Sequence, residues 1–243
     1  MKSPATVSPS LAGKFFSSGN RRDFLKTAAA GSAAVAIPAL LSSCKVGDTV
    51  IGTGNSGPTG PLLIIDFAKG DTAYLQFLYC HKQVQADFYA RTVAAFTGSD
   101  LTATEQVVIT DIKNHEFIHR DTLKAILGAN ALTVTPKFGS LAFKTASESV
   151  TFAGKYEDLT IGLINGMLQH LISSANIALL LEMQSVEARH SAAIRDELFP
   201  KSGASSGFSP GASDPAYALS GVAGVIQPFV TESFVFPNAP AGL

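Results

Sequence analysis

The sequence predicts an all-α protein: an up-down four-helix bundle with a long crossover between helices 2 and 3, followed by an irregular C-terminal tail. Three observations lead to this fold class. Four segments of helical length carry apolar side chains at helical spacing. Two of these segments open with a capping-box pattern. The connections between them run short, long and short, which is a common way to join the helices of a bundle.

The first 43 residues form a targeting segment that precedes the bundle. Arg21 and Arg22 stand before Phe-Leu-Lys and an Ala-rich apolar run, which is too short for a membrane span of ~20 residues. This order resembles a twin-arginine signal and predicts export by the machinery that moves folded proteins. The run ends at Cys44 in a pattern that resembles a lipobox, so we expect a lipid on Cys44 to hold the protein on the membrane in the periplasm or cell envelope. Cleavage nearby, with Cys44 as an ordinary thiol, is the alternative.

The length and composition of the chain limit how many domains it can form and which partners it can bind. At 243 residues and 46% hydrophobic, it can bury one substantial core. Residues 1–43 hold five Lys or Arg and one Asp, so the remainder is acidic overall, which argues against a nucleic-acid partner. Residues 44–65 are rich in Gly, Ser, Thr and Pro and predict a flexible tether. We expect the bundle over 66–198 and an irregular extension packed on it over 199–243.

The first helical hairpin is predicted from caps and breakers. Helix one covers about 71–97 and is closed by Gly98. Helix two is opened by the capping box at 102–105 and ends at Leu127, ahead of Gly128. The segment 129–145 holds a proline and a glycine and lacks a helical period, so it is the predicted crossover.

The second hairpin follows the same logic. A second capping box at 145–148 opens helix three, which is predicted over 147–173. Helix four covers about 176–198 and is stopped by Pro200.

Two helices carry acid and imidazole side chains inside their apolar stripes. The stripe of helix two is Ile109, Ile112, Glu116, His119, Leu123 and Ile126. The stripe of helix four is Leu180, Met183, Glu187, His190 and Ile194. In both stripes, successive positions are three or four residues apart, which is the spacing of the inward face of a helix. Both stripes have Glu and then His at corresponding positions. Burying these groups is costly unless something pairs with them, and metal ions do so. One Glu-x-x-His arises easily by chance, but two at matching positions do not.

The hairpin geometry predicts which residues lie level with these pairs. Counting back from the predicted turns, Lys82 on helix one is level with Glu116, and Glu157 on helix three is level with Glu187. The apolar periods around Lys82 and Glu157 place both side chains inward.

These residues resemble the ferritin-like superfamily, in particular its exported, desiccation-related branch. The resemblance covers 66–198 and depends on the segments 85–89, 116–119, 156–158 and 186–190, with Arg195. It implies a carboxylate-bridged di-iron or di-manganese centre. Helices one and three would each give a Glu, and helices two and four a Glu-x-x-His. The implied ligands present here are Glu116, His119, Glu157, Glu187 and His190.

Lys82 is the departure from that pattern, because it replaces the family's helix-one Glu. A protonated amine has no lone pair for a metal. Three states stay open: a complete two-metal centre, a mononuclear or weakened site, and a metal-free cluster in which Lys82 pairs with the carboxylates. The first function class is therefore an exported metal-binding protein with iron or manganese, and the second is a non-enzymatic stress-related or structural envelope lipoprotein. No substrate, reaction or oligomeric partner follows from the sequence.

The remaining candidates are weaker. Tyr89 is expected near the site, as a packing residue or a phenol that bonds a ligand. Cys80 is expected to be a buried small hydrophobic residue. His170 is level with no predicted ligand. His115 adjoins Glu116 in the sequence but is expected to face elsewhere, since neighbouring helical residues point about 100° apart. Two arginines are expected to flank the site or to pair with surface acids: Arg189 and Arg195.

Overall fold

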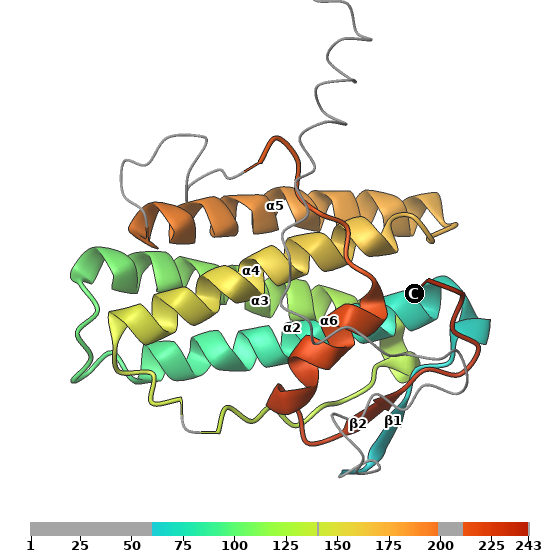
Figure 1. Cartoon of the computed structure of the whole chain (residues 1–243), viewed down its shortest axis with the longest axis horizontal. Helices are drawn as coiled ribbons and strands as arrows, with labels where there is room; N and C mark the ends of the chain where they lie inside the picture. Colours follow the sequence, from blue (N-terminus) through green and yellow to red (C-terminus); the bar gives the residue numbers. More distant parts are fainter. Residues whose placement is uncertain (1–59, 140, 199–210, 243) are drawn as a thin grey trace, which may run out of the picture. The chain divides into compact units, whose positions relative to one another are not determined.

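The protein is described by a computed structural model over residues 60–139, 141–198 and 211–242. Within these residues four long helices form the bundle: α2 (Asp71–Ala94), α3 (Ala103–Leu127), α4 (Ala146–Met167) and α5 (Ser174–Leu198). The main pairs are α2 with α3 and α4 with α5, and the pairs meet through α3–α5 and α2–α4 contacts (Figure 1). The long connection lies between α3 and α4, as the sequence predicts. The all-α bundle is confirmed.

Both predicted caps set the starts of their helices. Thr102 accepts a hydrogen bond from the backbone N–H of Glu105 at 3.2 Å, and the Glu105 carboxylate accepts from the N–H of Thr102 at 2.6 Å. Thr145 accepts from the N–H of Glu148 at 3.2 Å in the same way. These bonds satisfy N–H groups that the first turn of a helix leaves without partners.

The fourth helix starts earlier, and the third ends earlier, than their apolar periods suggest. The carboxylate of Asp71, at the start of α2, accepts hydrogen bonds from the N–H groups of Ile172 and Ser173 at 3.0 and 2.9 Å. It also accepts from the side-chain amide of Asn176 at 2.9 Å. Because Asp71 takes these N–H groups, the chain after Met167 turns into α5 instead of continuing α4.

Helix α2 is buried on most of its surface. Besides the other helices, two flanking segments cover it. Phe88 packs on Phe143 of the crossover with ring centroids 5.7 Å apart, and Phe77 packs on Phe234 of the tail at 5.4 Å. A polar side chain in the middle of α2 therefore has to find its partners inside the bundle.

The two flanking segments differ from their sequence-based predictions. Three residues of the predicted tether form β1 (Leu62–Ile64), which pairs in parallel with β2 (Ser233–Val235) of the predicted irregular tail. The tail also holds α6 (Leu219–Ile226), which packs on α4. Strands of three residues are too short to show an alternating pattern, so the sequence gives no sign of them. Short 3₁₀ turns complete the fold: η2 (Phe67–Lys69), η3 (Gly128–Asn130) and η4 (Gln227–Phe229).

Candidate metal centre

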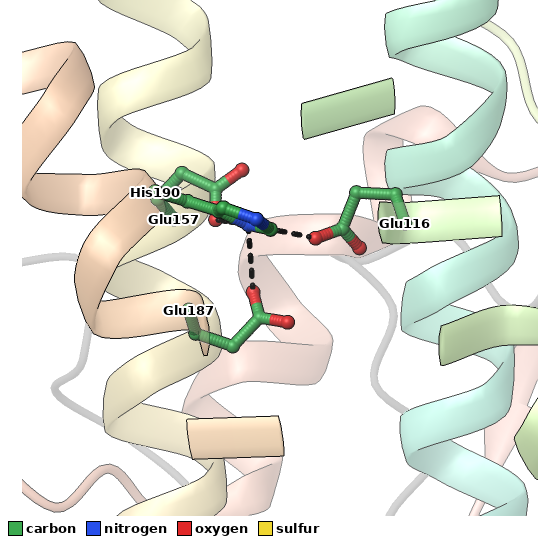
Figure 2. Close-up of side chains that lie close together, drawn as sticks. All are labelled: Glu116, Glu157, Glu187 and His190. Carbon is green, nitrogen blue, oxygen red and sulfur yellow. Dashed lines mark ion pairs between the residues drawn. The ribbon is translucent and has the colours of Figure 1, made fainter. Parts of the chain in front are cut away.

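A polar cluster lies in the interior of the bundle, among apolar layers. Lys82 of α2, Glu116 of α3, Glu157 of α4 and Glu187 of α5 are all 0% exposed. Figure 2 shows the three glutamates and His190 pointing toward one another from their helices. One ligand atom from each of these four residues lies within 4.8 Å of the others. The two stripes and the level partners predicted from the sequence therefore meet at one depth.

The second predicted histidine also reaches the cluster. Nδ1 of His119 lies 2.7 Å from Oε1 of Glu187 and 3.8 Å from Oε1 of Glu116. Nδ1 of His190 lies 3.2 Å from Oε1 of Glu116 and 3.5 Å from Oε2 of Glu157. All five predicted ligands are thus brought together.

Lys82 lies inside the cluster instead of turning away from it. Its ammonium donates to Oε2 of Glu116 at 2.6 Å, to Oε1 of Glu187 at 2.7 Å and to Oε1 of Gln85 at 2.9 Å. Burial alone would lower the pKa of Lys82, but attraction to Glu116, Glu187 and Glu157 outweighs burial and raises it. Lys82 therefore remains a cation bound between two carboxylates.

Glu157 is held by a different set of donors. Its Oε1 accepts hydrogen bonds from the phenol of Tyr89 at 2.5 Å and from Nε2 of Gln85 at 2.9 Å. Tyr89 thus bonds one of the predicted ligands. Gln85 links the two halves of the cluster, because its amide oxygen accepts from Lys82 while its amide nitrogen donates to Glu157.

In each of the three carboxylates, one oxygen accepts a hydrogen bond and the other does not. In each of the three glutamates, the second carboxylate oxygen has no hydrogen-bond partner. Nδ1 of His119 and Nδ1 of His190 have none either. The contacts between the histidines and the carboxylates, at 2.7–4.0 Å, are ion pairs when the imidazoles are protonated. The buried atoms of the cluster without a hydrogen bond are Glu116 Oε1, Glu157 Oε2, Glu187 Oε2, His119 Nδ1 and His190 Nδ1.

These atoms are suitable ligands for a metal ion. An unsatisfied buried polar group costs about 1–3 kcal/mol, and five of them at one place would be expensive without a partner. Carboxylate oxygens and imidazole nitrogens are a donor set that first-row transition metals bind. The residues present therefore fit a cation beside Nδ1 of His190, which has one oxygen of each glutamate within 4.0 Å.

The charges shift the ionisation of the cluster in both directions. Burial would raise the pKa of Glu116, but the Lys82 ammonium together with His119 and His190 outweighs burial and holds the pKa well below its usual value. Burial raises the pKa of Glu157 to about 7, against the opposing attraction of His190. Burial would lower the pKa of His190, yet the carboxylates of Glu116 and Glu157 raise it to about 10. The pKa of His119 is raised as well, by Glu116 and Glu187 against burial.

One prediction about the surroundings is wrong. The sequence predicts that His115 faces away from the centre, but its Nδ1 lies 2.9 Å from Nε2 of His190. The spacing of His115 and His119 could have indicated this, since residues four apart share one side of a helix.

The other weak candidates lie away from the cluster. Cys80 is fully buried, and burial raises its pKa, so its thiol is not a reactive group. His170 stacks on Tyr74 with ring centroids 5.6 Å apart. Arg195 pairs with Asp158 at 2.7 Å, and Arg189 is exposed. Cys44, Arg21 and Arg22 lie outside the described residues.

The bundle and its buried Glu/His cluster define a class of protein, the helical carboxylate–histidine proteins. The comparisons agree. Residues 70–200 match the family model of the ferritin-like domain, and residues 20–38 match the twin-arginine translocation pathway signal sequence. The chain belongs to the ferritin-like family and carries a signal for export out of the cytoplasm. A comparison with curated proteins finds no match. In the described part of the chain, none of the helices has the length and apolarity that a membrane span needs.

Proposed function

We propose that this exported protein binds one divalent transition-metal ion, iron or manganese, in the centre between α3, α4 and α5. The ligands are Glu116, Glu157, Glu187 and His190, with His119 beside them. The observation that carries the proposal is the division of the carboxylate oxygens. One oxygen of each glutamate accepts a hydrogen bond from Lys82 or Tyr89. The other oxygen is buried without a hydrogen bond and lies within 4.0 Å of Nδ1 of His190.

Lys82 takes the place of a second ion in this proposal. Its ammonium contacts the oxygens of Glu116 and Glu187 that face α2, which is where the family's helix-one glutamate would help to hold another metal. With all three glutamates ionised, Lys82 leaves two negative charges uncompensated. One divalent cation balances them.

A bound iron or manganese ion would supply one-electron redox chemistry, and the chain sets the conditions for it. Gln85 and Tyr89 fix Glu157 so that only Oε2 is available. The apolar layers above and below, including Ile112 and Ile194, exclude bulk water. We assign no substrate.

A second candidate function rests on the raised pKa values of the two imidazoles. If His119 and His190 are both protonated, they and Lys82 supply three positive charges for the three carboxylates. The protein would then be a metal-free envelope lipoprotein of the stress-related or structural kind. In both proposals the protein is of the desiccation-related branch, Cys44 carries the lipid, and the bundle occupies 66–198. The predicted tether of 44–65 is then shorter, because Leu62–Ile64 belong to β1.

Metal analysis of the protein purified from the cell envelope discriminates between the two. The first proposal expects about one ion per chain after growth in metal-rich medium. Iron, manganese and zinc contents near zero would support the metal-free candidate and overturn the first.

Replacing Lys82 tests its part in the proposal directly. Lys82→Glu restores the carboxylate that the family pattern has at this position, and we expect metal content to approach two ions per chain. Lys124→Glu makes the same charge change on an exposed position of α3 and should leave the content at one. Unchanged occupancy in Lys82→Glu would remove Lys82 as the reason for a single ion.

A further inference from the structure

An exposed histidine of α3 reaches the buried histidine of α5. Nδ1 of His115 lies 2.9 Å from Nε2 of His190, and the two rings are nearly parallel, with an angle of 9° and centroids 5.2 Å apart. The centroids are much farther apart than the two nitrogens. The rings therefore meet edge to edge, in the geometry of an N–H···N hydrogen bond, rather than face to face.

This contact decides which nitrogen of His190 has a free lone pair. A neutral imidazole carries one N–H and one acceptor nitrogen, and the hydrogen bond made by one nitrogen sets the state of the other. If Nε2 of His190 donates to Nδ1 of His115, the lone pair of His190 lies on Nδ1. Nδ1 is the atom that is buried without a hydrogen-bond partner and lies 3.2 Å from Oε1 of Glu116.

The two histidines of the centre differ in this support. His190 is held from its outer side by His115, whose own ring is exposed on α3. Among the described residues, no side chain forms a hydrogen bond with Nε2 of His119. His190, and not His119, also belongs to the group whose ligand atoms lie within 4.8 Å of one another.

We infer that His115 is a positioning residue of the metal centre, which holds His190 with Nε2 protonated and Nδ1 directed at the ion. This inference rests on the proposed function, since it concerns a ligand of the proposed ion. His115 does not bind the ion itself. It acts through His190, as outer partners of metal-bound histidines commonly do.

Three variants of the full exported chain test the inference through the affinity for Mn²⁺, measured under the same conditions as for the wild type. His115→Phe keeps a ring but removes the acceptor, and we expect the Mn²⁺ dissociation constant to rise about 10–100-fold. His115→Gln keeps an acceptor oxygen and should recover most of the affinity. His170→Phe is the matched control, because His170 is an exposed histidine stacked on Tyr74, away from the centre, and its affinity should equal that of the wild type.

A second measurement does not need the metal. In the metal-free, ¹⁵N-labelled protein, we expect a scalar coupling between Nε2 of His190 and Nδ1 of His115 across the hydrogen bond, and its loss in His115→Phe. Absence of this coupling in the wild type would overturn the inference. So would an affinity of His115→Phe equal to that of the wild type.

The two proposals fail in different ways. A wild-type protein that binds no Mn²⁺, iron or zinc overturns the proposed function, whatever the coupling shows. A wild-type protein that binds one Mn²⁺, with an affinity that His115→Phe leaves unchanged, overturns only the positioning role of His115.

Discussion

At the residue scale, Lys82 is the side chain on which the stability of the centre depends in the absence of metal. It is fully buried, and its ammonium lies 2.6 Å from Glu116 and 2.7 Å from Glu187. A buried ion pair adds little net stability compared with apolar packing, but removing one partner leaves an uncompensated buried charge. Lys82 thus compensates the charge of these carboxylates without a metal ion.

Lys82→Met should therefore destabilise the metal-free protein by about 3–5 kcal/mol, because two buried carboxylates lose their cation. Urea unfolding in the presence of a chelator measures this. Lys124→Met, on the exposed surface of α3, should change the unfolding free energy by no more than about 0.5 kcal/mol. Adding Mn²⁺ should return part of the stability lost in Lys82→Met, since the ion binds only the folded state. Equal stability of Lys82→Met and wild type would show that Lys82 does not compensate these charges.

His190 gives the metal-free protein a pH dependence with a definite sign. Its folded-state pKa is raised to about 10 from 6.5. A raised pKa means that the folded state binds the proton more tightly than the unfolded state. The stability from His190 is complete below about pH 6.5 and is lost progressively as the pH rises through about 10.

We therefore expect the melting temperature of the chelator-treated protein to fall between pH 7 and pH 10, and to fall less steeply in His190→Gln. In the same window the affinity for Mn²⁺ should rise, because the ion competes with the proton on Nδ1. Parallel slopes for wild type and His190→Gln would contradict the raised pKa of His190.

At the element scale, the sequence predicts the parts of the centre that periodicity can show. Glu116 and Glu187 interrupt clear apolar stripes on helices that bury one face, so their direction follows from spacing alone. The positions of Glu157 and Lys82, level with Glu187 and Glu116, follow from counting residues back from each predicted turn. Gln85 lies on the same inward run as Lys82, but its bonds to Lys82 and Glu157 do not follow from that run, because α2 is buried on most sides. The contact of His115 depends on how closely α3 approaches α5, which no single helix encodes.

The docking of the tail on α4 is another feature that local patterns do not show. The N–H of Tyr217 donates to the carbonyl of Gly162 at 2.8 Å, and a Cβ on Gly162 would come within 2.1 Å of the Tyr217 ring. Only a glycine allows this approach.

Gly162→Ala should release the tail from α4, and amide hydrogen exchange over residues 217–226 should become faster than in the wild type. Gly224→Ala is the matched control within α6, because its added Cβ meets nothing within 4 Å and alanine favours a helix. Exchange in Gly224→Ala should be equal or slower. If Gly162→Ala left exchange over this segment unchanged, the close contact with Tyr217 would not be what holds the tail.

At the scale of the whole molecule, the proposed location of the exported bundle is the membrane surface of the cell envelope. The chain carries a twin-arginine signal, and none of the helices in its described part has the length and apolarity of a membrane span. A lipid on Cys44 is the proposed attachment, joined to the bundle through the Gly-, Ser- and Pro-rich residues 45–59. One acyl chain binds a membrane only marginally, so stable attachment needs more than one chain or additional contacts.

Cys44→Ser should therefore move the protein from the membrane fraction to the soluble fraction of the envelope, and should abolish incorporation of labelled fatty acid. Cys80→Ala is the matched control, because it removes the other cysteine, whose side chain is fully buried in α2, and leaves the attachment in place. Export should persist in both variants, since the arginine pair is intact, whereas changing Arg21 and Arg22 together to Lys should retain the chain in the cytoplasm. If Cys44→Ser remained in the membrane fraction, the attachment would have to come from a protein surface instead of a lipid. The metal content of Cys44→Ser should stay at about one ion per chain, because the centre lies wholly within α2–α5 and makes no use of the tether.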